Sequence, residues 1–213
     1  MSPLFIALDG IDGTGKSTQV DRLAAYLREH NVRTATTKEP GGTQAGTAIR
    51  SILLDTNMIL EPDTEILLFC ADRVEHQQKV LSILEMGTSV ISDRFLSSTW
   101  AYQIFGRKER SDLLEAILPH TITRYPDLTI ILDMEPTVAV ERAKARLMQE
   151  GKTLTEGRFE AEEIEFFTEV RKGFHWYAGE ERFGRSVIVD ATGDIDEVSA
   201  KIQEIVNELN WSH

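Results

Sequence analysis

Short apolar runs recur along the chain and alternate with segments whose apolar residues follow a helical spacing. Runs without polar alternation are typical of strands that are buried on both faces of a parallel sheet. Strands that alternate with helices predict an α/β fold in which helices cover both faces of such a sheet. The predicted strands are residues 4–9, 34–38, 89–93, 128–133 and 186–190, of which 34–38 is the least apolar.

Two helices are defined most clearly by this pattern. One is predicted for residues 17–30, directly after the first strand, and the other follows Asp194. Glu197 lies three residues after Asp194, a spacing close to that of a capping box. The apolar positions at helical spacing are Val20, Leu23, Ala24 and Leu27 in the first helix, and Ile195, Val198, Ile202, Ile205, Val206 and Leu209 in the second.

A polar stretch with two glycines, residues 149–157, separates two helical patterns and predicts a mobile loop. It is either a surface connection or a lid that closes over bound phosphates and keeps water out. No repeat, low-complexity tract or linker divides the sequence. We therefore expect a single domain over residues 1–213, with the lid at about residues 146–160.

Composition narrows the class of partner. The formal net charge of −12 argues against nucleic acid, which is normally bound by a basic face. The apolar runs are all shorter than the roughly 18 residues that a membrane span needs, so no membrane segment is expected. The single cysteine, Cys70, suits a reducing, cytoplasmic compartment. It lies in an apolar run, which favours a buried, inert thiol over a reactive one.

Residues 10–17 fit the pattern G-x-x-x-x-G-K-[ST] of a phosphate-binding loop, and they lie between a strand and a helix as that loop requires. Glycines allow turns in which several N–H groups point inward, and the helix N-terminus adds partial positive charge. Lys16 would bring a full charge to the β- and γ-phosphates, and the Ser17 hydroxyl suits Mg²⁺. The predicted phosphate-binding residues are Gly10, Ile11, Asp12, Gly13, Thr14, Gly15, Lys16 and Ser17.

Two further segments carry side chains suited to a nucleotide. Glu39 follows the second strand, at the end of the sheet where ligands of open α/β folds bind, although Pro40 and two glycines also suit a plain turn. Phe69 and Arg73 are four residues apart and share one face of a helix. They suit a nucleobase, as a stacking ring and a hydrogen-bond donor. The alternative is a core phenylalanine beside a solvated arginine.

Asp93 and Arg94 end the third predicted strand. A carboxylate at this position, beside the phosphate-binding loop, is placed to hold Mg²⁺ directly or through water, and Arg94 would point at phosphates. Thr99, Tyr102 and Gln103 follow at the i, i+3 and i+4 positions of a predicted helix. All three side chains can therefore face one cleft.

With these motifs the chain resembles the thymidylate kinases, which are nucleoside monophosphate kinases that act on dTMP. The resemblance covers about residues 4–193. The Glu-Pro-Gly-Gly-Thr and Ala-Tyr-Gln elements are specific to that family, whereas the phosphate-binding loop is not. The resemblance is carried by residues 9–18, 38–43, 68–73, 93–94 with 98–103, 126–133, and Arg158-x-Glu160 ahead of Phe166-Phe167.

The resemblance implies a P-loop NTPase fold: a doubly wound, five-stranded parallel sheet of order 2-3-1-4-5, with flanking helices and a short lid. It implies that a homodimer phosphorylates dTMP to dTDP with ATP and Mg²⁺, in dTTP synthesis. Phe69 would stack on thymine, Arg73 would bond to its exocyclic oxygen and Gln103 to its ring N–H. The other implied contacts are Glu39 and Tyr102 at the sugar, Arg50, Arg94, Ser98 and Thr99 at the monophosphate, Asp12 at the 3′-hydroxyl, Thr18 in the ATP loop, and Arg142 with Thr192 at adenine.

Position 13 bears on the mechanism that the resemblance implies. Some family members carry a basic residue directly after the loop aspartate, but this chain has Gly13 and is similar to the bacterial type, which supplies the charge from the lid. Arg146 and Arg158 are the candidates, and Arg158 is favoured because it precedes Glu160 in the matching pattern. The predicted catalytic residues are Lys16, Arg94, Asp12 and Arg158, and the predicted metal ligands are Ser17 and Asp93.

Two other functions stay open from the sequence alone. A kinase for another acceptor, above all dUMP, is hard to distinguish, because one methyl group is worth only about 1–3 kcal/mol of discrimination. A P-loop regulatory switch is the second alternative. A guanine-specifying Asn-Lys-x-Asp element would favour that switch, and the sequence contains none.

Overall fold

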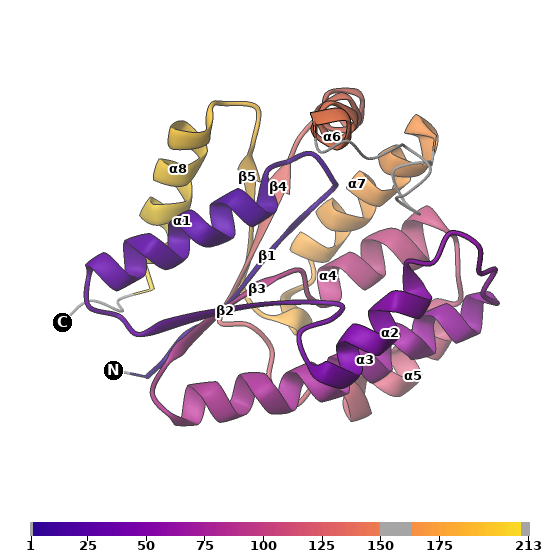
Figure 1. Cartoon of the computed structure of the whole chain (residues 1–213), viewed down its shortest axis with the longest axis horizontal. Coiled ribbons are helices and arrows are strands. Elements are labelled where there is room, and N and C mark those ends of the chain that lie inside the picture. The colour runs from indigo at the N-terminus through magenta and orange to yellow at the C-terminus, as the bar shows by residue number, and fades with distance from the viewer. Residues whose placement is uncertain (1, 150–162, 210–213) are drawn as a thin grey trace.

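The computed structural model describes residues 2–149 and 163–209. A sheet of five parallel strands in the order β2-β3-β1-β4-β5 forms its centre (Figure 1). The predicted sheet and its predicted order are confirmed, and among the strand positions only the first is shifted, by one residue. The strands are β1 (Phe5–Gly10), β2 (Thr34–Lys38), β3 (Ser89–Asp93), β4 (Leu128–Asp133) and β5 (Ser186–Asp190).

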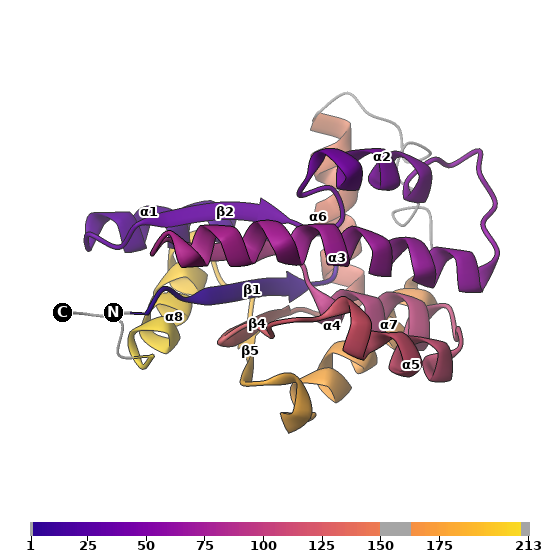
Figure 2. The same cartoon turned by 90° about the horizontal axis from the view of Figure 1, so that it is seen from below.

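Helices cover both faces of the sheet. On one face α1 (Lys16–Glu29) packs beside α8 (Ile195–Asn207). The other face carries α3 (Pro62–Glu85), α4 (Leu96–Thr99) and α7 (Ile164–Ala178) (Figure 1). Figure 2 shows α2 (Gln44–Leu53) beside α3. The remaining elements are α5 (Ser111–Thr121) against α3, α6 (Pro136–Gln149) against α7, the π-helix η1 (Trp100–Gly106) and the short 3-10 helix η3 (Glu181–Phe183).

Strand position explains why one predicted strand is the least apolar. The central strands β1, β3 and β4 are buried along almost their whole length, because neighbouring strands and helices surround them. β2 lies at an edge of the sheet, and Thr36 and Lys38 are exposed there. The capping box of α8 is also confirmed: Asp194 Oδ1 accepts from the Glu197 N–H at 2.9 Å, and Glu197 Oε2 accepts from the Asp194 N–H at 3.0 Å.

The segment after β3 differs from the regular helix that its spacing predicts. α4 continues directly into η1, whose wider turns separate Tyr102 from Thr99 and Gln103. The Tyr102 hydroxyl points to the phosphate-binding loop, whereas the Thr99 and Gln103 side chains bond to residues of α3. π-Helical turns occur frequently at functional sites.

Most of the predicted lid, residues 146–160, lies outside the described residues, and α6 extends through Gln149. Across residues 2–149 and 163–209, every helix is too short or too polar to cross a membrane.

Candidate functional site

The phosphate-binding loop joins β1 to α1, as predicted. Gly13 and Gly15 have φ angles of 92° and 87°, in the left-handed region that favours glycine. The Thr14 hydroxyl donates to the Ile11 carbonyl at 2.8 Å and braces the turn. Lys16 Nζ donates to the same carbonyl at 2.9 Å, so the lysine lies along the loop. Burial and the charge of Arg94 lower the pKa of Lys16.

Gly13 also touches α6 through its backbone. A Cβ at this position would lie 1.9 Å from the carbonyl oxygen of Ala139. A side chain of any kind therefore has no room here unless α6 moves. This contact gives a physical reason why no basic residue follows Asp12 in this chain.

Gly13→Ala is expected to lower the free energy of unfolding more than Gly15→Ala does. Both substitutions force a left-handed backbone on an L-residue, at about 1–2 kcal/mol each. Only Gly13→Ala adds the clash with Ala139, because in the described part of the chain nothing lies within 4 Å of a Cβ at position 15. Urea denaturation of the two variants measures the difference, and equal losses would contradict the close packing of α6 on the loop.

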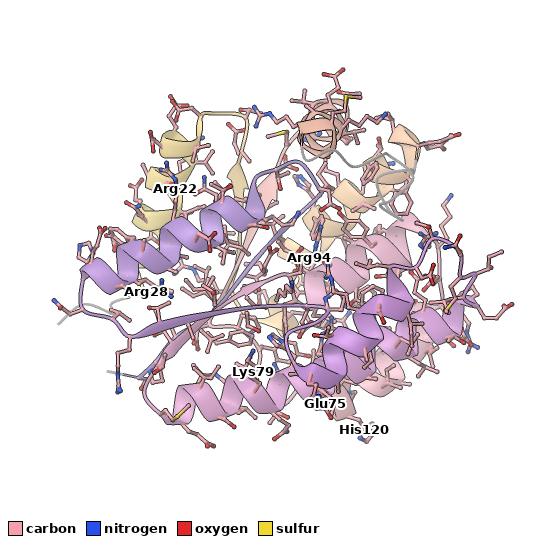
Figure 3. All side chains as sticks on the ribbon, viewed as in Figure 1. Arg22, Arg28, Glu75, Lys79, Arg94 and His120 are labelled. Atoms are coloured by element: carbon pink, nitrogen blue, oxygen red, sulfur yellow. The ribbon has the colours of Figure 1, made fainter. Side chains whose placement is uncertain are left out.

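Arg94 connects the phosphate-binding loop to the helix after β3. Its Nη2 donates to Asp12 Oδ1 at 2.7 Å and its Nη1 to Ser98 Oγ at 2.8 Å. The Tyr102 hydroxyl donates to the other oxygen of Asp12 at 3.1 Å. Burial would raise the pKa of Asp12, but the charges of Arg94 and Lys16 outweigh it and hold that pKa below its usual range. Figure 3 shows Arg94 between the loop after β1 and α4, whereas the labelled His120 lies at the periphery.

Asp9, at the end of β1, connects the phosphate-binding loop to the segment that follows β3. Its carboxylate is fully buried and accepts hydrogen bonds through both oxygens. No role was predicted for Asp9 from the sequence, although a carboxylate directly before the loop glycine was the available signal. The donors to Asp9 are the N–H groups of Gly10, Phe95 and Ser98, the hydroxyls of Ser97 and Ser98, and the guanidinium of Arg94.

Ser17 and Asp93 meet at the edge of the site. The Ser17 hydroxyl donates to Asp93 Oδ2 at 2.8 Å, so the two predicted metal ligands converge. Hydroxyl and carboxylate oxygens fit Mg²⁺, which usually takes one or two protein ligands and completes its shell with phosphates and water. The described residues contain no group of three or more His, Cys, Asp or Glu that could hold a metal alone. A cavity of about 440 Å³ opens beside these two residues and also borders Lys38 and Lys79.

Arg50 approaches the same region from α2. Its Nη1 donates to the Pro40 carbonyl at 2.9 Å. Burial and the nearby charge of Arg94 lower the pKa of Arg50, so two guanidinium groups lie close enough to repel each other. Such a pair is suited to an anion that neutralises both charges.

A second polar cluster, further from the loop, is centred on Glu39. Arg73 Nε donates to Glu39 Oε2 at 3.0 Å, and His76 Nδ1 lies 2.6 Å from Glu39 Oε1. Arg73 Nη2 donates to the Thr99 hydroxyl at 2.8 Å. All four side chains are buried, so the alternative of a solvated Arg73 is wrong. The charges of Arg73 and His76 outweigh burial and lower the pKa of Glu39.

One donor of Arg73 is left over. Its Nη1 is buried and has no hydrogen-bond partner among residues 2–149 and 163–209. A buried guanidinium N–H without a protein partner points to a bound group that accepts from it. Phe69, one turn earlier on α3, is half-buried. Gln103 is buried beside Thr99 on the neighbouring helix, and its amide nitrogen donates to Glu65 Oε1 at 2.9 Å.

The predicted adenine contacts also come together. Arg142, on α6, donates to the carbonyls of Ala191 and Thr192 at 3.4 and 3.3 Å, which places α6 against the loop after β5. Of the remaining predicted residues, Thr18 is exposed in the first turn of α1. Arg158 lies outside the described residues, as does the side chain of Arg146.

Comparison with known proteins matches residues 8–202 to the family model described as thymidylate kinase. Thymidylate kinase of Oleidesulfovibrio alaskensis is 41% identical over 97% of this chain and 98% of its own length. The enzyme of Nitratidesulfovibrio vulgaris strain DP4 is 42% identical over 95% of this chain and 92% of its own. The crystal structure of thymidylate kinase from Ehrlichia chaffeensis superposes with a TM-score of 0.75 at 30% identity, covering 97% and 99% of the two chains.

Proposed function

Because this chain belongs to the thymidylate kinase family, we propose that the site at the carboxyl ends of β1 and β3 transfers the γ-phosphoryl group of ATP to the phosphate of dTMP. The activity predicted from the sequence is confirmed at the level of the family, and the chain is an ATP-dependent phosphotransferase. Family membership also removes the alternative of a regulatory switch. The assignment of individual residues is our proposal.

The Arg73 N–H that finds no partner among the described residues is the observation that carries the substrate assignment. Arg73 Nη1 is buried and lies on the same side chain that bonds to Thr99. Gln103 is buried four residues after Thr99. A guanidinium donor beside an amide suits a base edge with a carbonyl next to a ring N–H, as in thymine. Phe69, half-buried one turn before Arg73, is placed to stack on the ring.

The arginine pair at the other end suits the substrate phosphate. Arg50 and Arg94 carry like charges that repel each other, and a phosphate bound between them would neutralise both. Ser98 and Thr99 would add hydroxyl groups to the phosphate contacts, and Tyr102 and Asp12 would meet the sugar. The acceptor phosphate is already ionised at neutral pH, so the reaction needs no strong general base.

Catalysis then depends on positioning the ATP phosphates and on neutralising the negative charge of the transferring group. The loop from Gly10 to Ser17 cradles the ATP phosphates, and Lys16 and Arg94 balance the charge on the oxygens of the transferring group. Ser17 and Asp93 would hold Mg²⁺, which draws negative charge from the phosphate oxygens when it is bound. Arg142 and Thr192 flank the adenine.

Arg158→Ala is expected to lower kcat more than it raises KM, because we propose that this arginine meets the transferring phosphoryl group only near the transition state. The packing of Gly13 on α6 supports a cation from elsewhere, since position 13 has no space for one. Steady-state kinetics of Arg158→Ala and Arg146→Ala separate the two candidates. A kcat loss confined to Arg146→Ala would show that Arg146 is the catalytic residue.

We also propose that the enzyme is a cytoplasmic homodimer. Leu67 and Val74 on α3 are 49% and 39% exposed, and Ala71 between them is exposed as well. Their i, i+4, i+7 spacing makes one apolar stripe that a second copy can cover. Light scattering should then give twice the 24.0 kDa mass of one chain. Cys70 is a buried free thiol, as predicted, and burial raises its pKa, which suits a reducing compartment.

ADP release with dTMP, dUMP, dCMP, dGMP, UMP and thymidine offered separately tests the proposed reaction. Turnover with dTMP well above dUMP is the expected result. Turnover with a different acceptor would keep the kinase and overturn the base pocket assigned to Phe69, Arg73 and Gln103. ATP hydrolysis that no acceptor stimulates would overturn the proposed reaction altogether.

A further inference from the structure

A buried carboxylate lies directly behind the predicted base-reading amide. Glu65, on α3, is 1% exposed, and its Oε1 accepts from Gln103 Nε2 at 2.9 Å. Arg107 Nε lies 3.3 Å from the same oxygen and supplies the opposite charge. Gln103 is also 1% exposed. The phosphoryl chemistry described above gives neither Glu65 nor Gln103 a role, so the function of this pair is a separate question.

The carboxylate determines which way the amide faces. The two ends of a glutamine amide have nearly the same shape, but one end only donates and the other only accepts. An ionised carboxylate accepts and cannot donate. Turning the Gln103 amide over would bring two oxygens together and leave both without a proton between them. Glu65 therefore accepts from the NH₂ group of Gln103, and the amide oxygen of Gln103 faces away from Glu65.

We propose that Glu65 is a specificity-determining positioning residue, which fixes the Gln103 amide so that its oxygen, rather than its NH₂ group, reads the base. This inference rests on the proposed function, since it assumes that the base lies between Arg73 and Gln103. The Arg73 N–H donates and the Gln103 oxygen accepts. Thymine and uracil offer the matching pair, a carbonyl oxygen and a ring N–H.

Cytosine offers the reverse pair, an amino group and a bare ring nitrogen. It would place donor against donor at Arg73 and acceptor against acceptor at Gln103. Both contacts would leave buried polar groups unpaired, which is the kind of mismatch that discriminates strongly between substrates. Arg73 rejects the amino group because a guanidinium can only donate. Gln103 rejects the bare nitrogen only while Glu65 prevents its amide from turning.

Glu65→Gln tests this directly, because a glutamine at this position can either donate or accept and so lets the Gln103 amide turn. We expect kcat/KM for dTMP to fall and the ratio of kcat/KM for dCMP to that for dTMP to rise by about tenfold, the size of one oriented hydrogen bond. Asp72→Asn is the matched control. It removes another carboxylate of α3 that is 1% exposed and bonds to the Gly41 N–H. Its dCMP to dTMP ratio is expected to stay that of the parent chain.

The double variant Glu65→Gln/Gln103→Glu exchanges the two groups and keeps the hydrogen bond between them. The carboxylate at position 103 again presents an acceptor to the base, so the preference for dTMP over dCMP should return. An unchanged ratio in Glu65→Gln would overturn the inference, as would a double variant that prefers dCMP. Failure of the parent chain to use dTMP would instead overturn the proposed function, so the two failures are distinguishable.

Discussion

Lys16→Ala is expected to reduce kcat by at least about 10²–10³-fold, the cost of losing one positioned cation or donor at a developing charge. Lys16 is 7% exposed, lies along the phosphate-binding loop and bonds to the Ile11 carbonyl, so its ammonium group is held within the loop rather than in solvent. KM for dTMP should change little, because the proposed base and monophosphate contacts come from α2, α3 and the segment after β3.

Steady-state kinetics with Mg·ATP and dTMP measure this result. Lys172→Ala is a suitable control, since Lys172 is 61% exposed and pairs with Glu169 on the surface of α7. The control should keep its full kcat. Near-normal turnover in Lys16→Ala would contradict the role proposed for the loop lysine.

Arg94→Met should lower kcat/KM for dTMP by about 10³-fold. The substitution removes the positive charge that we propose contacts both the monophosphate and the transferring phosphoryl group. The substitution also removes a cation that Asp9 and Asp12 share, and among the described residues Asp12 then keeps only the Lys16 cation, at 3.5 Å. Asp9 keeps its hydroxyl and N–H donors, but Asp12 loses its shortest hydrogen bond. Without the charge of Arg94, burial raises the pKa of Asp12 relative to the parent chain.

Arg94→Met should also change how the stability of the protein depends on pH. The parent Asp12 has a lowered pKa and stays ionised through the neutral range, so it contributes stability that is lost only in strong acid. In Arg94→Met that contribution should disappear at a higher pH. Arg182→Met, which removes an arginine paired with Glu115 far from the loop, is the control. An unchanged kcat/KM in Arg94→Met would contradict the proposed phosphate clamp.

The sheet could be predicted because each strand is recognisable from its own contiguous run of residues. β1, β3 and β4 are buried on both faces, so each is a short apolar run, and β2 is polar because it lies at the edge. The phosphate-binding loop was predictable for the same reason, since its glycines and Lys16 are contiguous in sequence.

The polar network beneath the site could not be predicted from local pattern. Glu65 and Gln103 are 38 residues apart, and Asp9 and Ser97 are 88 apart, so no spacing rule connects them. The burial of Arg73 depends on Glu39 in the same way. The π-helix η1 was missed because its apolar and polar residues also fit an ordinary helix, and its wider turns are visible only in three dimensions.

The contact between Gly13 and α6 couples the two ends of the proposed ATP site. Backbone meets backbone there, with no side chain between them to bend or change rotamer. The same helix carries Arg142, which bonds to the loop after β5. Under the proposed assignment, a shift of the phosphate-binding loop would move α6 and the proposed adenine contacts with it, because close-packed elements transmit displacement.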